Sequence, residues 1–358
     1  MKTLIVIPTF NEKENIKRII NAIFYFVPKA HILIVDDSSP DGTGKIVAKL
    51  ERKYPRKLYL LTRAKKEGLG KAYVAGFRWA LGRPYQFIVS MDADFSHDPK
   101  YLPEMLKAAL ENKIVIGSRY IPGGGILGWD WKRQFNSRIA NIVTRLMLGI
   151  KAKDATAGYK VYHRSFLKSL PLSKLVSSGY AFQVEMLYLA KERMAKIAEV
   201  PIVFADRRAG ESKIAGELTK SAKIVLRLFM RRRVVRQAAK FMTIGLANVF
   251  VDWGIYFALT RWIHLDEIPS RIISSSIALT SSYIFNRIWT FQSRDRAVAQ
   301  QFVKFIIVNG MGLVWNNLLF AFFIKTLHIY DLIALVLTTV IVFFWNFGLT
   351  KMWAFRDK

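Results

Sequence analysis

Four long apolar blocks dominate the last third of this chain and constrain its fold more than any other feature. They cover residues 241–262, 268–289, 302–327 and 332–353. Each block is close to the roughly 20 residues that a helix needs to cross a bilayer. The sequence therefore predicts an integral membrane protein in which residues 239–358 form a bundle of four transmembrane helices. The alternative is a buried helical bundle in a soluble protein.

The loops around these blocks separate into basic and non-basic ones. Lys and Arg precede the first block, occur between the second and third, and follow the fourth, whereas loops 264–267 and 328–331 contain neither. Because basic loops stay on the cytoplasmic side, we expect both termini and the whole N-terminal part to be cytoplasmic. Tryptophans at block ends are predicted to be interfacial anchors; they are Trp262, Trp289 and Trp353.

The four blocks also look like a duplicated pair. The second block ends in Asn286–Phe291, and the fourth ends in the similar stretch Asn346–Phe355. Polar residues at membrane depth cost free energy unless they face other helices, so we expect such residues to pack the bundle. The alternative is a transport path. The residues concerned are Asn248, Asp252, Asn286, Asn309, Asn316, Asn317 and Asn346.

A strongly basic segment precedes the first block. Residues 207–240 contain 11 Lys and Arg against two Glu, with apolar residues at helical spacing between them. Because basic amphipathic helices are typical of anionic membrane surfaces, residues 211–238 are predicted to form interfacial helices. The chain as a whole has a net charge of +29, which implies an anionic partner. The basic residues adjoin the apolar blocks and no nucleic-acid-binding motif occurs, so nucleic acid is not expected to be that partner.

Residues 1–210 show a different pattern, in which short apolar runs alternate with amphipathic stretches. Continuous apolar strands separated by helices are typical of a parallel α/β sheet that is covered on both faces. The chain contains no cysteine, which excludes disulfides and thiolate metal sites. The predicted strands are Leu4–Ile7, Ile32–Val35, Leu58–Leu61, Phe87–Met91 and Ile114–Gly117, and the predicted helices are Glu14–Phe26, Gly44–Lys53, Leu69–Leu81 and Leu102–Leu110.

Two carboxylates follow directly on one of these strands. Asp92 and Asp94 come after Phe87–Met91, and residues two apart in an extended segment face the same side. Hard oxygen ligands of this kind suit Mg²⁺ or Mn²⁺, which is commonly held by one or two carboxylates together with substrate phosphates. Open α/β sheets bind ligands at the carboxyl ends of their strands. Asp41, by contrast, precedes a helix start and is expected to cap it.

Several motifs of residues 1 to about 235 resemble those of a known family. The stretches that carry the resemblance are Pro8–Glu12, Val35–Thr43, Met91–Pro99, Gly117–Tyr120, Gly128–Arg133, Asp154–Gly158, Gly179–Met186 and Gly210–Lys213, in that order. They are similar to those of dolichyl-phosphate mannose synthases, which are inverting family-2 glycosyltransferases of the Rossmann-like GT-A fold. The four-span tail resembles the small GtrA-like membrane proteins. The resemblance implies GDP-mannose as donor and a dolichyl or other polyprenyl phosphate as acceptor.

The resemblance also implies where the donor binds. Asp92 and Asp94 would hold the Mg²⁺ or Mn²⁺ that neutralises the leaving diphosphate. Arg207 and Lys213 would close over that diphosphate. The remaining donor contacts implied by the motifs are Pro8, Phe10, Glu12, Val35, Asp37 and Ala93.

The acceptor is a phosphate monoester, whose second pKa of ~6 makes it anionic at neutral pH. It serves as its own nucleophile, so a protein base is not required, and cations must hold it. Motif positions give this role to Arg119, Lys132, Arg133 and Ser137. Glu185, with Gln183, lies where related enzymes keep a catalytic base, and here we expect it to orient the site. His97 has either a supporting role or a metal contact.

The Gly-rich loop 121–129 and the amphipathic helix predicted over Asn136–Ile150 are expected to dip into the lipid interface; the alternative is ordinary packing against the sheet. Two further functions stay open at this level. One is a glucosyltransferase that uses UDP-glucose, and the other is a loader for a lipid-linked-sugar flippase formed by the membrane domain. The pattern does not predict an oligomeric state.

Overall fold

The computed structural model describes residues 2–175, 179, 181–206 and 217–356, and the chain divides into two units, Met1–Phe229 and Met230–Lys358. Unit 1 is built on a seven-stranded sheet with the order β3-β2-β1-β4-β7-β5-β8. Its strands are β1 (Thr3–Thr9), β2 (His31–Asp36), β3 (Leu58–Thr62), β4 (Phe87–Ser90), β5 (Ile114–Ser118), β7 (Lys160–His163) and β8 (Ile197–Pro201).

The five predicted strands are confirmed, but the sheet is not wholly parallel. β3, β2, β1 and β4 run parallel, whereas β7 lies antiparallel between β4 and β5. β7 is only four residues long and contains the charged Lys160, so its apolar pattern is weak. The sheet is therefore mixed, and β7 separates the β1–β4 half from β5 and β8.

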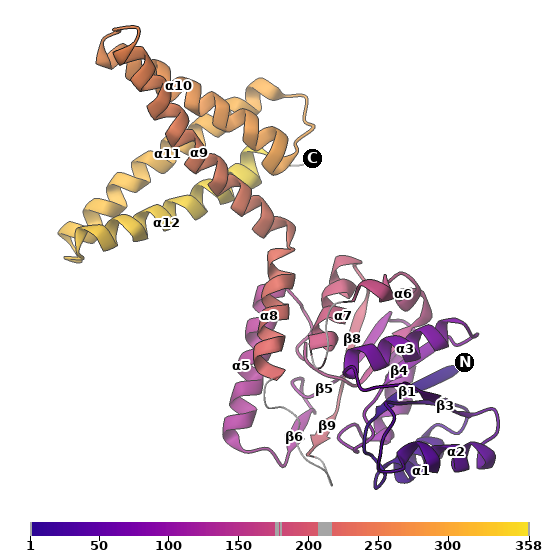
Figure 1. Cartoon of the computed structure of the whole chain (residues 1–358). Coiled ribbons are helices and arrows are strands. Elements are labelled where there is room, and N and C mark those ends of the chain that lie inside the picture. The colour runs from indigo at the N-terminus through magenta and orange to yellow at the C-terminus, as the bar shows by residue number, and fades with distance from the viewer. Residues whose placement is uncertain (1, 176–178, 180, 207–216, 357–358) are drawn as a thin grey trace. The chain divides into compact units, whose positions relative to one another are not determined.

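Helices cover both faces of this sheet (Figure 1). On one face, α1 (Ile16–Phe26), α2 (Thr43–Lys53), η1 (Pro99–Tyr101) and α4 (Leu102–Ala108) contribute to a core that is rich in isoleucine. On the other face lie α3 (Leu69–Leu81), α6 (Arg164–Lys168), η2 (Leu172–Lys174) and α7 (Ala181–Glu192). α3 approaches the sheet closely at Gly76, where a Cβ atom would lie 2.4 Å from Cγ1 of Val6.

A smaller substructure completes unit 1. β6 (Gly125–Leu127) and β9 (Val203–Ala205) form a two-stranded parallel sheet. α5 (Trp131–Leu148) begins at Asp130, whose side chain accepts a hydrogen bond from the amide of Arg133, as an N-cap residue does. α8 (Glu217–Met230) lies beside α5 (Figure 1), and its Val225 and Leu228 are buried in the same core as Leu148.

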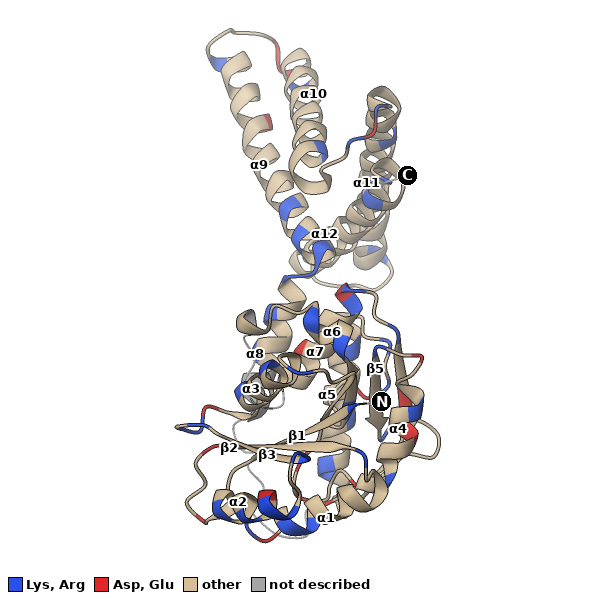
Figure 2. Cartoon of the chain, turned by 90° about the vertical axis from the view of Figure 1, so that its right-hand side faces the viewer, with Lys and Arg blue, Asp and Glu red and all other residues tan. Residues whose placement is uncertain are grey.

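The described residues of unit 2 form four long helices and two π-helical turns. These are α9 (Arg233–Arg261), α10 (Glu267–Phe285), η3 (Asn286–Phe291), α11 (Val298–Lys325), α12 (Asp331–Leu349) and η4 (Thr350–Ala354). Charged residues are sparse along these helices (Figure 2). Large apolar side chains on them are exposed, including Leu246, Phe250 and Trp253, as expected where lipid replaces water.

Within the described residues, three helices are long and apolar enough to cross a membrane: Arg233–Arg261, Val298–Lys325 and Asp331–Ala354. The second predicted block forms α10, which is 19 residues long but is diluted by Arg271 and several serines. A membrane protein is thereby confirmed, while the fourth span stays a prediction. α9 also continues across the predicted boundary at residue 238. Among the described residues, the predicted interfacial segment 211–238 consists of α8 and the start of α9.

The predicted duplication is visible in the contacts. Lys240 lies over the ring of Trp289, and Lys304, 64 positions further on, lies over Trp353. The ring centroids of Phe241 and Phe291 are 6.3 Å apart, and those of the equivalent pair, Phe305 and Phe355, are 6.2 Å apart. Phe291 and Phe355 stack at 4.7 Å. The two helix pairs are thus repeats that meet at their π-helical turns.

Candidate active site

The carboxyl ends of three neighbouring strands meet at one edge of the sheet. β1 lies between β2 and β4, and its Thr9 pairs with Asp36. The residues that follow each strand therefore lie close together: Phe10 to Glu12 after β1, Asp37 to Asp41 after β2, and Met91 to His97 after β4. This is the edge at which parallel sheets bind ligands.

The two carboxylates after β4 have different environments. Asp92 has 28% of its side chain exposed and accepts a hydrogen bond of 3.2 Å from the hydroxyl of Tyr73. Asp94 is 4% exposed, and its Oδ1 accepts bonds from the amide and hydroxyl of Ser96. The extended-strand argument for these residues is wrong in detail, because β4 ends at Ser90 and the chain bends through the motif.

His97 supports the backbone of the motif. Its Nδ1 accepts a hydrogen bond of 3.0 Å from the amide of Asp92, which leaves the proton of the neutral ring on Nε2. Burial lowers the pKa of His97, so the ring is neutral at pH 7. The ring stacks on Tyr159, and a Cβ atom on Gly158 would lie 3.0 Å from its Cε1. The supporting role predicted as one alternative for His97 therefore fits these contacts.

The donor set fits a hard divalent cation that a substrate helps to bind. Two carboxylates at a strand end offer oxygen ligands, and Mg²⁺ typically takes its remaining ligands from water and phosphates. No group of three or more His, Asp or Glu residues that could hold an ion occurs in the described part of the chain. A metal at Asp92 and Asp94 would thus need the substrate diphosphate to complete its coordination.

The predicted donor contacts after β1 and β2 are mostly engaged with neighbours. Asp37 forms an ion pair of 2.8 Å with Arg63, and burial raises the pKa of this carboxyl despite the opposite effect of the guanidinium. Glu12 accepts a bond from Asn15, and Lys66 lies 4.1 Å from the centroid of the Phe10 ring. These residues lie where a nucleotide would meet the strand ends.

Val35 is an exception among the predicted donor contacts. It is 0% exposed and packs in the core, whereas Pro8 in the same register is partly exposed. The Val35 side chain is therefore not exposed at this edge of the sheet, and the predicted donor contact at Val35 stays a prediction. Ala93 is also buried. Asp41 accepts bonds from the amide and hydroxyl of Thr43, the first residue of α2, although the N-cap position itself is Gly42 and Asp41 lies one residue before it.

The predicted acceptor residue Arg119 forms a buried ion pair. Its Nε and Nη2 donate to the two oxygens of Asp154 at 2.7 and 2.8 Å, and its Nη2 also donates to Thr156. Asp154 is 0% exposed. Burial alone would raise the pKa of Asp154, but the Arg119 charge and its hydrogen bonds outweigh this and hold the pKa below its ordinary value. Asp154 and Thr156 thus fix the orientation of the Arg119 guanidinium.

Among the described residues, the guanidinium of Arg133 has fewer hydrogen-bond partners than that of Arg119. Its Nη1 pairs with Asp206 at 2.9 Å, and its Cζ lies 4.1 Å from the centroid of Trp129. Nε of Arg133 and Nε1 of Trp129 are both buried and have no hydrogen-bond partner among the described residues. Ser137 lies one helical turn further along α5 and is bonded to the Tyr120 hydroxyl at 2.8 Å. Two adjacent donors without acceptors are what an anionic ligand would satisfy.

Phe204 on β9 connects the acidic and cationic parts. Its ring centroid is 5.9 Å from that of His97 and 5.6 Å from that of Trp129, and Cζ of Arg119 lies 5.5 Å from it. His97 of the acidic motif, Trp129 and Arg119 therefore all contact a single aromatic ring. The acidic motif and the cationic residues thus lie in the same region of unit 1.

The other predicted residues divide into three groups. Gln183 and Glu185 are buried on the first turns of α7. Lys132 is exposed, with its Nζ 5.7 Å from the centroid of Trp131. Arg207 and Lys213 lie outside the described residues.

α5 carries an apolar stripe on its exposed side. Trp131, Phe135, Ile139, Val143 and Leu146 are all between 44% and 74% exposed and recur at helical spacing. A stripe of this size next to the cationic residues is typical of a surface that meets a membrane or another protein. It lies on the helix that was expected to dip into the lipid interface.

Sequence reasoning missed Tyr73, Asp154 and Lys160 as site residues. Tyr73 binds Asp92, and Asp154 binds Arg119. Lys160 is 0% exposed on β7. The available signal was chemical: a Lys between the apolar residues Tyr159 and Val161 is unusual in a buried strand.

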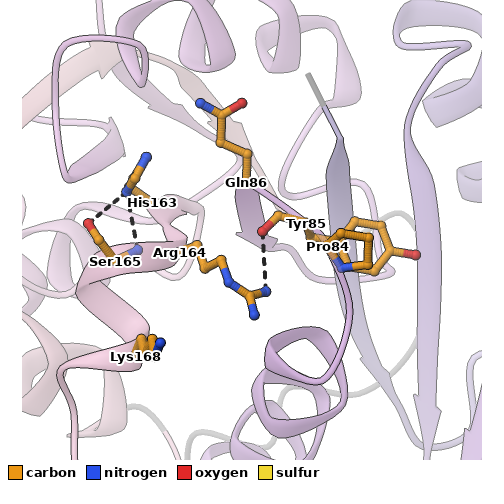
Figure 3. Close-up of a pocket in the computed structure, with 7 residues that line it drawn as sticks. All are labelled: Pro84, Tyr85, Gln86, His163, Arg164, Ser165 and Lys168. Carbon is orange, nitrogen blue, oxygen red and sulfur yellow. Dashed lines mark hydrogen bonds between the residues drawn. The ribbon is translucent and has the colours of Figure 1, made fainter.

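A pocket of about 390 Å³ lies elsewhere (Figure 3). Its residues Pro84 to Gln86 precede β4, whereas the acidic motif follows that strand, so the pocket is at the opposite edge of the sheet. Arg164 in this pocket donates to backbone carbonyls, including that of Leu81 at 2.6 Å. Its guanidinium therefore serves the fold, and we assign the pocket no part in the site.

Comparison with known proteins agrees with this geometry. The family "Glycosyl transferase family 2" matches residues 4–170, and "GtrA/DPMS, transmembrane domain" matches residues 240–355. The polyprenol monophosphomannose synthase of Mycolicibacterium smegmatis is 42% identical over 222 residues, which are 62% of this chain and 84% of that protein. The undecaprenyl-phosphate mannosyltransferase of Micrococcus luteus is 41% identical, over 62% of this chain and 91% of that protein.

Among solved structures, glucosyl-3-phosphoglycerate synthase from Mycobacterium tuberculosis is 18% identical, with a TM-score of 0.48, over 64% of this chain and 79% of that one. This likeness is too low to carry an argument about the site. The sheet, the strand-end acids and the matched domains define a membrane-bound family-2 glycosyltransferase of the GT-A fold. The chain belongs to the family of the polyprenol monophosphomannose synthases, which confirms the resemblance seen in its motifs.

Proposed function

We propose that this enzyme transfers mannose from GDP-mannose to the phosphate of dolichyl or another polyprenyl phosphate, with inversion at the anomeric carbon. The names of its relatives support mannose and a polyprenyl phosphate. The observation that carries the proposal is that Phe204 contacts both His97 of the acidic motif and Trp129, beside which Arg133 keeps a buried Nε that has no hydrogen-bond partner among the described residues.

Each part of the site then has a chemical task. The strand ends after β1 and β2 bind the nucleoside, and Asp92 and Asp94 would hold Mg²⁺ or Mn²⁺. When bound, the metal neutralises charge that develops on the leaving diphosphate. Tyr73 and His97 keep Asp92 in place; burial and the neighbouring Asp92 raise the pKa of Tyr73, so its hydroxyl stays a donor.

The acceptor phosphate binds at Arg133, Trp129 and Ser137, with Arg119 held in position by Asp154. One phosphate oxygen attacks the anomeric carbon from the face opposite GDP. The new carbon–oxygen bond forms as the bond from that carbon to the GDP oxygen breaks, and GDP leaves with the bonding electrons. No proton moves, because the phosphate is already anionic above its second pKa of ~6. Glu185 therefore orients the site and is not needed as a base.

The membrane would supply the lipid-linked acceptor in this reaction. The acceptor carries its phosphate at the lipid surface, and the exposed stripe on α5 would enter the interface beside Arg133. The basic residues near α8 and the start of α9 would bind anionic headgroups. The distribution of Lys and Arg supports a catalytic unit and both termini on the cytoplasmic side.

The test is a donor and acceptor panel with the purified full-length chain. We expect turnover with GDP-mannose and a polyprenyl phosphate in the presence of Mg²⁺ or Mn²⁺. Asp98→Asn is the matched control for Asp94→Ala and should stay active, because Asp98 lies four residues from Asp94 and caps η1. Turnover with UDP-glucose alone would overturn the choice of donor. Movement of the lipid-linked sugar across vesicles by the membrane unit would support the loader function instead.

A further inference from the structure

Lys160 is a fully buried lysine beside the active site. It lies on β7 and is 0% exposed. The carbonyl of Gly158, two residues earlier, accepts a hydrogen bond of 2.7 Å from Ser90 at the end of β4, the strand that leads into Asp92 and Asp94. A charged side chain is rarely buried in this way unless it is paired.

The ammonium group of Lys160 has three acceptors. Its Nζ donates to the carbonyl of Ala157, to the side-chain Oε1 of Gln183 at 2.9 Å, and to the backbone carbonyl of Gln183 at 3.5 Å. An ammonium group carries three protons, so the number of donors matches the number of acceptors. Burial lowers the pKa of Lys160 to about 7, while Asp154 acts in the opposite direction. The acceptor set favours the charged form.

These contacts determine how the Gln183 amide is turned. Its Oε1 accepts from Lys160 and also from the hydroxyl of Tyr162 at 3.4 Å. Its Nε2 therefore points the other way, where it is buried and has no hydrogen-bond partner among the described residues. A Cβ atom on Gly158 would lie 3.5 Å from Nε2 of His97 and 3.8 Å from Nε2 of Gln183. The amide nitrogen thus lies toward the Nε2 edge of the His97 ring, whose Nδ1 holds the backbone of Asp92.

We propose that Lys160 is a positioning residue that fixes the side-chain amide of Gln183 with its NH₂ group facing the donor-binding side of the active site. The inference rests on the proposed function for what Gln183 contacts there, namely an oxygen of the bound nucleotide sugar. Without the lysine, the amide can rotate by 180° and present its oxygen, an acceptor, where the substrate needs a donor. The loss would then appear in turnover and not only in stability.

A double-mutant cycle tests this directly. Lys160→Met removes the charge at similar length, and Gln183→Ala removes the amide. We expect each to lower kcat/KM for GDP-mannose by about 10- to 100-fold, as supporting residues do. If Lys160 acts through Gln183, the double variant should lose no more than Gln183→Ala alone. Losses that multiply would show that the two residues act independently and would overturn the proposal.

A variant that keeps the pairing covers the case in which Lys160→Met does not fold. Gln183→Glu retains an oxygen for Lys160 but replaces the NH₂ donor, so it should melt no lower than wild type while losing turnover to the same extent as Gln183→Ala. Wild-type turnover in Gln183→Glu would overturn the proposal.

Lys191→Met is the matched control on α7, because Lys191 donates to the Leu148 carbonyl at 2.7 Å, and it should alter the melting temperature but not kcat. Absence of mannose transfer by the wild type would count against the proposed function, whereas additive losses in an active enzyme would count only against the role of Lys160.

Discussion

The ion pair between Arg119 and Asp154 gives the sharpest quantitative prediction. Asp154 is 0% exposed and accepts from Nε, Nη2 and the backbone amide of Arg119, with Thr156 as a further donor. The Arg119 side chain is 8% exposed. Removal of the carboxylate in Asp154→Ala would leave a guanidinium buried without its counter-charge.

The cost of such a change is large compared with that of a surface pair. Breaking a buried ion pair by removing one partner costs about 3–5 kcal/mol. For a unit of this size, 1 kcal/mol corresponds to about 2–4 °C in melting temperature, so the expected loss is about 6–20 °C. Lys71→Met breaks an exposed pair with Glu67 of similar length, 3.0 Å, and should leave the melting temperature almost unchanged, because water screens exposed pairs.

Thermal melts of the full-length chain in detergent measure both variants. The pH dependence gives a second check, because the pKa of Asp154 in the folded chain is held below its ordinary value of 3.8. The stabilisation should be complete above pH 3.8 and disappear as the pH falls through the lower, folded value. The gap between wild type and Asp154→Asn should therefore be constant from pH 8 to pH 5 and narrow below about pH 4. Equal losses for Asp154→Ala and Lys71→Met would refute this reasoning.

Three other outcomes follow from the same contacts. Asp94→Ala should nearly abolish turnover while the chain stays folded, and a chelator should abolish wild-type turnover until Mg²⁺ or Mn²⁺ is restored; full activity in either case would contradict the metal assignment. Arg133→Ala should raise KM for the polyprenyl phosphate more than it weakens GDP-mannose binding measured by calorimetry, while Arg138→Ala, on the exposed side of the same helix, should not; equal effects on both substrates would move Arg133 to the donor side. Gly76→Ala should destabilise the fold by about 1–3 kcal/mol in denaturant melts despite a gain of up to about 1 kcal/mol in helix propensity, because its Cβ would lie 2.4 Å from Val6; a more stable variant would show that α3 can shift.

The regular elements were predictable from the sequence because their apolar periodicity is strong. The helix over Leu69–Leu81 was predicted with the observed bounds, and the five apolar runs all became strands. β7 was not predicted, since it is short, contains Lys160 and owes its place to pairing with strands distant in sequence. Antiparallel insertion of this kind is set by long-range contacts that local periodicity does not encode.

The candidate site was predictable as a set of positions but not as a set of contacts. Motif order predicts Asp92, Asp94 and Arg133, and in the fold Phe204 contacts both His97 of the acidic motif and Trp129, which lies beside Arg133. The pairing of Arg119 with Asp154 spans 35 positions, and no local pattern indicates which acid meets which base. Burial of Val35 likewise depends on α3 packing over β2.

The central claim is that mannose passes from GDP-mannose to a lipid phosphate in one inverting step. Its most direct test is product analysis by mass spectrometry and anomeric NMR after incubation of the full-length enzyme with GDP-[¹³C]mannose, a polyprenyl phosphate and Mg²⁺ or Mn²⁺. We predict a polyprenyl phosphate mannose with the β configuration and one GDP per product. An α-linked product, or mannose released to water with no lipid product, would contradict the account.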